Sequence, residues 1–211
     1  MALYEEVSQL LFPTRCFGCN AVGISICSTC RQEWSPHYYL SHISKLRIHS
    51  AVIYSKTASR ILLAAKEQGL KGADILIIDS LVHVLSQGQF DRHNIRLVPI
   101  PSSNAALRRR GRSFIVEITE TVAKIMGLPQ SDCLEVIRKV RDQSGLHATA
   151  RSHNLHGAFG LKRGVFPRGD LIVIDDVVTT GATLGEAARV LKSQGFHVIA
   201  SVTACVAQPL R

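Results

Sequence analysis

The sequence predicts an α/β protein in which helices flank a parallel β-sheet, with a small cysteine-rich module near its beginning. Residues 171–174 (Leu-Ile-Val-Ile) are typical of a strand buried on both faces, and a helical pattern over residues 184–194 follows them. Residues 198–205 supply a second apolar strand, which completes a βαβ unit and implies a right-handed crossover. Two closely spaced Cys-x-x-Cys pairs mark the module.

Length and composition bound the organisation of the chain. With 211 residues, 46% hydrophobic content and 19% charged residues, it is expected to form one folded domain of ordinary size plus a small appendage. We divide it into residues 1–47, a zinc-binding module with a connector, and residues 48–211, the α/β domain. The formal net charge of +9 favours anionic partners, but charge does not distinguish nucleic acid from polyphosphate substrates.

The N-terminal segment and the apolar runs indicate a compartment. Residues 1–11 carry acidic side chains where a signal peptide needs basic ones. No apolar run approaches the roughly 20 residues that cross a bilayer. We therefore expect no membrane segment and a cytoplasmic location, where thiols stay reduced.

Cysteine spacing predicts a metal site in the first 30 residues. Four thiolates from two Cys-x-x-Cys pairs can surround one Zn²⁺ tetrahedrally, and a complete set of protein ligands indicates a structural zinc. Two disulfides or a redox pair are the alternatives, which a reducing cytosol disfavours. The predicted zinc ligands are Cys16, Cys19, Cys27 and Cys30. Cys133 and Cys205 lie far away in sequence and are expected to be buried as small apolar side chains.

Periodicity and breakers assign the middle of the chain. Residues 34–48 are interpreted as a connector, and the scattered histidines His37, His42 and His49 are set aside as surface residues. A polar, weakly periodic stretch over residues 138–159 indicates a functional loop or lid. The other expected elements are a strand at 50–54, helices at 58–68 and 73–85, a strand at 96–101, a loop at 102–112 and a helix from 115 to 125; within 73–85, residues 75–78 also fit a strand.

Four arginines gather in the loop at 102–112, where Arg108, Arg109 and Arg110 are followed by Gly111 and Arg112. Such a cluster fits nucleic acid, yet the loop after a parallel strand is also where α/β folds place substrate-binding groups. The patch alone supports nucleic-acid binding and phosphate binding equally.

The strongest functional motif follows the strand at 171–174. Two adjacent acids, Asp175 and Asp176, stand where that strand is expected to end, and a run of small and hydroxyl residues leads into the next helix. A tight loop at a helix N-terminus presents free N–H groups and a positive dipole end, which suits a phosphate. The residues of this loop are Val177, Val178, Thr179, Thr180, Gly181, Ala182 and Thr183.

This motif has two other interpretations. An ordinary strand–turn–helix would use the aspartates and threonines only as caps. A phosphoacceptor pocket, as in receiver domains, would use the acid pair to hold magnesium. In that class the pair follows the first strand of the chain, whereas here it lies near the C-terminal end.

Residues 171–183 resemble the phosphoribosyl pyrophosphate (PRPP) loop of type I phosphoribosyltransferases, which implies a type I phosphoribosyltransferase-like sheet. From Cys16 to Val206 the chain is also similar to the ComF family. That likeness adds to the four cysteines a lysine in Lys66-x-x-Gly69 and the run Val98-Pro-Ile-Pro before the arginine loop. It continues with Gln143-x-x-Leu, Arg151-x-x-Asn and Gly157-Ala-Phe before the acidic loop.

The resemblance implies a Mg²⁺-dependent phosphoribosyltransferase. Asp175 and Asp176 would bind the ribose hydroxyls and stabilise a developing cation, and residues 179–183 would hold the 5′-phosphate. Lys66, which from the sequence alone is better explained as a solvated helix lysine, would neutralise pyrophosphate, with Arg108–Arg110 as weaker candidates. Residues 143–154 would close over the site.

The acceptor of the phosphoribosyl group is not specified by the resemblance. The family follows Arg-Gly with an aromatic residue, Asn and Gln, whereas here Gly111 precedes Arg112, Ser113 and Phe114, so acceptor contacts differ. The alternative is a non-catalytic PRPP-sensing or nucleic-acid-associated regulatory protein. ComF relatives are linked to DNA uptake, which makes single-stranded DNA or a competence protein a candidate partner; the oligomeric state is left open.

Overall fold

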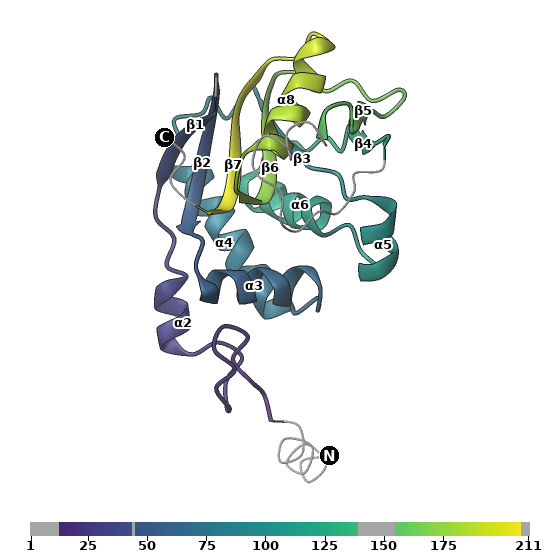
Figure 1. Cartoon of the computed structure of the whole chain (residues 1–211). Helices are drawn as coiled ribbons and strands as arrows, with labels where there is room; N and C mark the ends of the chain where they lie inside the picture. Colours follow the sequence, from purple (N-terminus) through teal and green to yellow (C-terminus); the bar gives the residue numbers. More distant parts are fainter. Residues whose placement is uncertain (1–12, 44, 139–154, 208–211) are drawn as a thin grey trace.

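The computed structural model describes residues 13–43, 45–138 and 155–207, which form a five-stranded sheet with helices on both faces (Figure 1). The strand order is β1-β2-β7-β6-β3. Only β1 runs antiparallel to its neighbour, so the parallel sheet predicted from the sequence is confirmed. The strands are β1 (Tyr39–Ile43), β2 (Leu46–Ile53), β3 (Ile95–Pro99), β6 (Asp170–Val178) and β7 (Val198–Val206).

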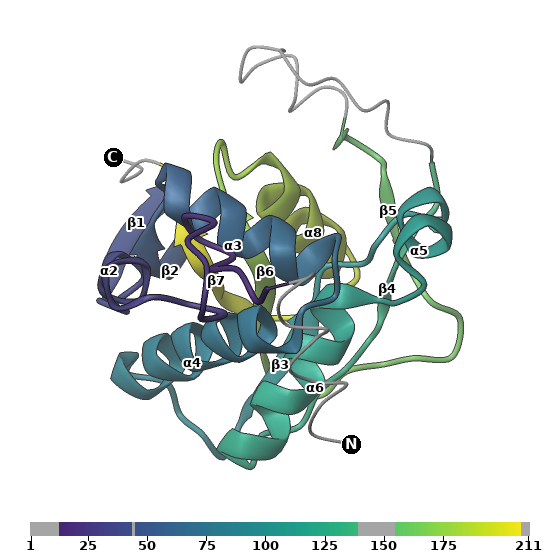
Figure 2. The same ribbon diagram turned by 90° about the horizontal axis from the view of Figure 1, so that it is seen from below.

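Two apolar layers enclose this sheet. Helices α3 (Lys56–Lys66), α4 (Lys71–Gln87) and α6 (Phe114–Met126) cover one face (Figure 2). Helix α8 (Ala182–Ser193) and the hairpin of β4 (Leu134–Val136) and β5 (Phe159–Leu161) cover the other. In β6, Ile172 and Ile174 pack on the first layer, whereas Leu171 and Val173 pack on the second. This is why a continuous apolar run, with no polar alternation, forms the central strand.

The chain reverses its direction across the sheet between β3 and β6. From β2 the chain continues through α3 and α4 to β3 at the far edge of the sheet. From β6 it returns through α8 to β7. Because parallel crossovers are right-handed, the two directions place their helices on opposite faces. The connections that follow β3 and β6 therefore diverge at neighbouring strand ends, which is where open α/β sheets bind ligands.

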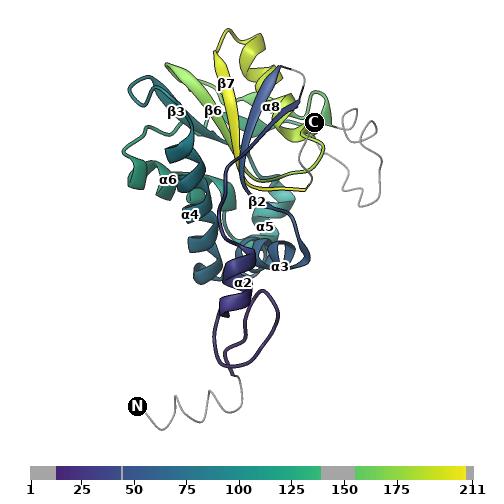
Figure 3. The same ribbon diagram turned by 90° about the vertical axis from the view of Figure 1, so that its left-hand side faces the viewer.

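The cysteine module lies at one end of the molecule, against the layer of α3 and α4 (Figures 1 and 3). Its helix α2 (Ser28–Glu33) ends at Trp34, whose side chain is 2% exposed. The indole Nε1–H donates to the carbonyl oxygen of Leu76 (3.1 Å) and to Ser80 Oγ (2.9 Å) on α4. Buried tryptophan with a satisfied N–H contributes both apolar area and orientation, so Trp34 fixes the module on the helices.

The prediction of a connector at residues 34–48 is incomplete. Residues 39–43 form β1, and β2 begins at residue 46, earlier than the expected start at 50. Polar residues hide this strand from a hydrophobic pattern: Ser50 Oγ and Thr203 Oγ1 lie 2.7 Å apart, and the buried His49 Nδ1 lies 2.6 Å from Tyr38 Oη. His49 is thus a core residue and not the surface residue that was expected.

The loop predicted at residues 102–112 contains a short helix, α5 (Asn104–Arg110). Ser103 Oγ accepts a hydrogen bond from the Ala106 N–H at 3.2 Å and so caps its start. Gly111, at φ 67°, ends it in the left-handed region that favours glycine. Residues 75–78 lie within α4, so their strand alternative is wrong.

None of the helices among the described residues has both the length and the apolar character that a membrane-spanning helix needs.

Candidate active site and cysteine cluster

The acid pair lies inside β6 and not after it. The strand continues through Asp175, Asp176, Val177 and Val178, because β7 is long enough to pair with it as far as Val206. The prediction of a strand that ends at residue 174 is therefore wrong in its boundary. Asp175 is 8% exposed and Asp176 3%, so both carboxylates are held in the sheet with little water.

Lys66, the last residue of α3, supplies the counter-charge to this pair. Its Nζ lies 2.7 Å from Asp176 Oδ2, across 110 residues of sequence. Helix α3 begins at the Ser55 cap, which accepts from the Ala58 N–H, and runs eleven residues to bring the lysine to the end of β6. Lys66 is thus not the solvated helix lysine that the sequence alone favoured, because its ammonium group is ion-paired with a buried carboxylate.

Charge and burial divide the protons within this triad. Burial, and then the charge of Asp176, raises the pKa of Asp175 well above its ordinary value. Burial also acts on Asp176, but Lys66 outweighs it and lowers the pKa of that carboxyl. Burial acts to lower the pKa of Lys66, but both carboxylates outweigh it and the net shift is upward. Asp176 and Lys66 therefore form an ion pair, and Asp175 is the acid that most readily holds a proton.

The predicted phosphate loop connects β6 to α8. Gly181, at φ 71°, is the N-cap of α8 and has no side chain with which to cap the helix. Thr180 Oγ1 accepts from the Ala182 N–H at 3.4 Å. Val177 and Val178, which the prediction included in the loop, pair with β7. The turn at residues 179–181 and the first turn of α8 thus present the backbone donors that an anion needs.

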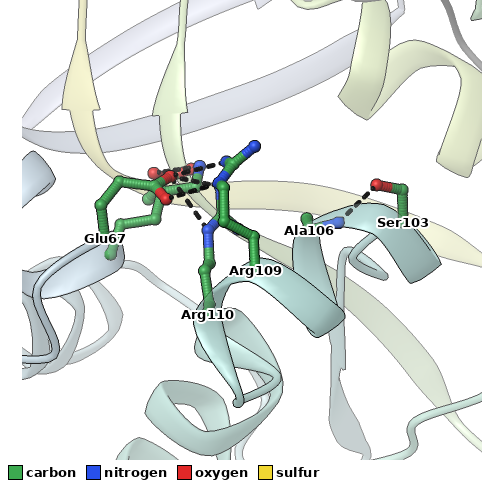
Figure 4. Close-up of polar contacts among 7 residues, drawn as sticks. Glu67, Ser103, Ala106, Arg109 and Arg110 are labelled. Atoms are coloured by element: carbon green, nitrogen blue, oxygen red, sulfur yellow. Dashed lines mark hydrogen bonds and ion pairs between the residues drawn. The ribbon is translucent and has the colours of Figure 1, made fainter.

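Glu67 joins the predicted arginines to the site, and sequence reasoning missed it. Its carboxylate accepts from Arg109 Nε (3.1 Å) and Nη2 (3.2 Å), and from Arg110 Nε (2.9 Å) and Nη2 (2.6 Å) (Figure 4). Arg108 is exposed and forms no ion pair within the described part of the chain. Only the position of Glu67 next to Lys66, at the end of a helix, could have drawn attention to it.

Carboxylates neutralise most of the arginine cluster. Arg112, like its two neighbours on α5, is paired: its Nη1 lies 2.9 Å from Asp74 Oδ2 and its Nε lies 2.9 Å from Glu117 Oε2. The cluster is therefore less of a free cationic surface than the sequence suggested.

The predicted lid is only described at its two ends. Arg138 Nη2 donates to the carbonyl oxygen of His156 at 2.8 Å, and the Gly157 N–H donates to Glu186 Oε1 on α8 at 2.7 Å. Residues 143–154, the predicted closing element, lie outside the described residues. Both ends of the stretch are thus held next to α8, the helix that follows the phosphate loop.

The four predicted zinc ligands meet in one cluster, and their Sγ atoms all lie within 4.8 Å of one another. Thiolates placed about 2.3 Å from a central zinc would be about 3.8 Å apart, and Cys19 and Cys27 Sγ are 3.7 Å apart. The Cys27 N–H donates to Cys16 Sγ, and the Cys30 N–H to Cys27 Sγ, as expected for thiolate acceptors. All six cysteines are free, so the disulfide alternative is wrong, and Cys133 and Cys205 are buried as predicted.

The space around the cluster is so small that one position of the ligand loop accepts only glycine. A Cβ on Gly18 would lie 2.7 Å from Cys30 Sγ, so only glycine lets the first knuckle approach the second. Burial acts to raise the pKa of Cys16, but N–H donors led by Cys27 outweigh it and lower the pKa to about 6. The donor set therefore fits a tetrahedral zinc.

Comparison with known proteins gives two kinds of relative. No protein-family model matches the chain. Competence protein F of Haemophilus influenzae is 28% identical over 106 residues, or 49% of this chain and 46% of that protein. DNA utilization protein YhgH of Salmonella typhimurium is 32% identical over 105 residues, with the same 49% and 46% covered. The chain thus spans about half the length of the curated relatives it matches.

Among solved structures, orotate phosphoribosyltransferase from Aeropyrum pernix is 18% identical, with a TM-score of 0.42 over 83% of this chain and 77% of that chain. Adenine phosphoribosyltransferase from Trypanosoma brucei is 12% identical, with a TM-score of 0.44 over 86% and 81%. Over about half its length, the chain is a homologue of competence protein F and of YhgH, and it joins a four-cysteine cluster to a mostly parallel α/β sheet.

Proposed function

We propose that the chain binds PRPP together with Mg²⁺ at the end of β6 and transfers the phosphoribosyl group to an acceptor. The observation that carries the proposal is the ion pair of Lys66 with the buried Asp176, directly before a phosphate-type loop at the switch point of the sheet. Perturbed acids with a specific cationic partner, at a strand end where ligands bind, are typical of an active site.

The residues divide the substrate between them. Backbone N–H groups and hydroxyls of residues 179–183 would hold the 5′-phosphate at the N-terminus of α8. Asp175 and Asp176 would accept hydrogen bonds from the ribose hydroxyls. Their charge would stabilise the positive charge that develops on the ribose as its bond to pyrophosphate breaks. Lys66 would move from Asp176 to the departing pyrophosphate.

Two carboxylates form an oxygen donor set that fits Mg²⁺ only in part. That ion keeps several waters and takes further oxygens from substrate phosphates, so Asp175 and Asp176 would hold it only with PRPP present. When bound, it neutralises charge on the pyrophosphate. The ammonium group of Lys66 contacts Asp176 Oδ2, one of the oxygens that would face the ion.

Ligand-dependent unfolding tests this proposal. PRPP at 100 times its dissociation constant is expected to raise the unfolding free energy by about 2.7 kcal/mol, and Mg²⁺ is expected to enhance the effect. Asp175→Asn plus Asp176→Asn should abolish both the stabilisation and PRPP turnover. Asp132→Asn, which removes a carboxylate paired with Lys162 elsewhere, serves as the control. Turnover that survives the double substitution would disprove the assigned roles.

A second candidate function, nucleic-acid association, is favoured by a groove beside the cysteine cluster. The groove has a volume of about 490 Å³ and is lined by Arg15 and Arg60 together with Phe17. Each arginine donates to a backbone carbonyl, of Asn20 and of Gly18, and neither forms an ion pair with a carboxylate of the described residues. Unpaired guanidinium groups beside an aromatic ring suit the phosphates and bases of a single strand.

Salt titration of oligonucleotide binding checks this second function. We expect a fluorescent single-stranded DNA to bind with steep salt dependence. Arg15→Ala plus Arg60→Ala should reduce the slope of log K against log salt by about 1.4, because each phosphate contact contributes about 0.7. Lys124→Ala plus Lys192→Ala removes two exposed cations on other helices as the control. An equal loss in both variants would show only general charge attraction.

A further inference from the structure

Two arginines, Arg109 and Arg110, form an anion-binding site that is occupied by the carboxylate of Glu67 (Figure 4). All four of its hydrogen bonds come from guanidinium groups, at 2.6 to 3.2 Å, and both Nε and Nη2 of each arginine take part. A guanidinium fork of this kind binds a phosphoryl group in the same manner as a carboxylate. The geometry is thus that of a phosphate-binding site in which the Glu67 carboxylate takes the place of the phosphate.

The site belongs to the same cationic group as Lys66. Lys66 and Glu67 are consecutive at the end of α3, and the positive charge of Arg110 acts to lower the pKa of Lys66 against its net upward shift. Hydrogen bonds from Arg110, opposed by burial and reinforced by Arg109, lower the pKa of Glu67 to about 2. Glu67 therefore stays ionised at neutral pH, and three cations of this group face two resident carboxylates, Asp176 and Glu67.

The Glu67 carboxylate can also turn away from the two arginines. Its side chain is 29% exposed, and that of Arg109 is 60% exposed, so the carboxylate can turn into water without opening the core. The ion pair with Arg109 is exposed and therefore weak, whereas the Arg110 side chain is 10% exposed and its pair with Glu67 is more sheltered from water. An incoming diphosphate carries more charge than the single carboxylate, which contacts only the arginines.

We infer that Glu67 is a built-in competitor of diphosphate for the guanidinium groups of Arg109 and Arg110 beside Lys66, which lowers diphosphate affinity and binds the arginines again when the diphosphate departs. The inference rests on the proposed function for its natural ligand, the pyrophosphate of PRPP. An internal competitor reduces the affinity of every ligand that must displace it by the same factor. Its removal should therefore tighten diphosphate binding and slow its release.

Inorganic pyrophosphate and ribose 5-phosphate separate binding at the two arginines from binding in the rest of the site. By calorimetry, Glu67→Gln is expected to bind pyrophosphate about tenfold more tightly than the natural chain, equivalent to about 1.4 kcal/mol. Ribose 5-phosphate, which would bind at residues 179–183, should bind both proteins equally. Glu117→Gln, which removes one of the two carboxylates paired with Arg112 and leaves Arg109 and Arg110 untouched, is the matched control and should show no gain.

Further variants protect the test against misfolding and general charge effects. Glu67→Asp keeps the charge but retracts the carboxylate, and it should give part of the same gain. Adding Arg109→Ala and Arg110→Ala to Glu67→Gln should remove the gain. Unchanged or weaker pyrophosphate binding by Glu67→Gln, or an equal gain in Glu117→Gln, overturns the inference. Pyrophosphate binding is measured whether or not PRPP binds, so failure of the proposed function leaves a distinct result.

Discussion

Replacing Cys30 with serine is expected to abolish zinc binding and to unfold the module at residues 13–33. The segment has few large apolar side chains of its own, and Cys30, one of the four clustered thiols, is 2% exposed. Zinc-finger peptides gain about 10–16 kcal/mol of apparent binding free energy from the metal at neutral pH, which exceeds what a chain this short can gain from packing. Loss of one thiolate therefore removes most of the stabilisation.

Metal analysis and hydrogen exchange measure this effect. The natural protein should contain one zinc per chain, the Cys30→Ser variant none, and amides of residues 13–33 should exchange rapidly in the variant. Cys133→Ala removes a buried cysteine outside the cluster and should retain the metal. Slow exchange at residues 13–33 in a zinc-free variant would show that packing alone holds the module.

Replacing Lys66 with methionine should produce the second large effect, a loss of about 2–4 kcal/mol of unfolding free energy at neutral pH. The substitution leaves the Asp176 carboxylate buried without its cation, and breaking one partner of a buried pair costs about 3–5 kcal/mol. The lower range applies because the lysine side chain is 28% exposed and therefore partly screened.

Acidity should change the size of this loss in a defined direction. In the natural protein the lowered pKa of Asp176 adds stability above the ordinary carboxyl range, and this is lost as pH falls through the lower folded value. Without Lys66, burial dominates and the variant recovers stability as the acid takes up a proton. The difference between the two proteins should therefore be largest near neutral pH and should shrink below about pH 4.

Urea unfolding of both proteins between pH 3 and pH 8 provides the measurement. Lys162→Met, which breaks the more exposed pair with Asp132, is the control and should cost far less. A Lys66→Met loss that does not vary with pH would mean that the lysine acts through packing and not through the charge of Asp176.

Apolar runs predicted the central fold well because a parallel strand that is buried on both faces has a continuous run of apolar residues in its sequence. Residues 171–174 and 198–205 have such runs, and the spacing of the cysteines follows from tetrahedral geometry. Residues 39–49 lack such a run, since Ser41, His49 and Ser50 are buried polar residues whose environment is set by distant segments. Tertiary hydrogen bonds, such as that of Ser50 with Thr203, stabilise this strand, and the local sequence does not indicate them.

The candidate site was predictable where one segment carries it. Asp175, Asp176 and the loop at residues 179–183 are contiguous, so their juxtaposition follows from local structure. Glu67 meets Arg109 and Arg110 across more than 40 positions of the chain, and no local pattern announces that contact. The same holds for the strand boundary at residue 178, which is set by the length of the neighbouring β7.

Burial of Trp34 between the module and α4 ties the metal to the survival of the whole protein. In a chain that has not bound zinc, the Trp34 indole would no longer pack on the helices, and an apolar patch on α3 and α4 would be exposed. Surfaces of that kind attract chaperones and proteases and promote aggregation. We therefore expect the cellular lifetime of the protein to follow the availability of the ion.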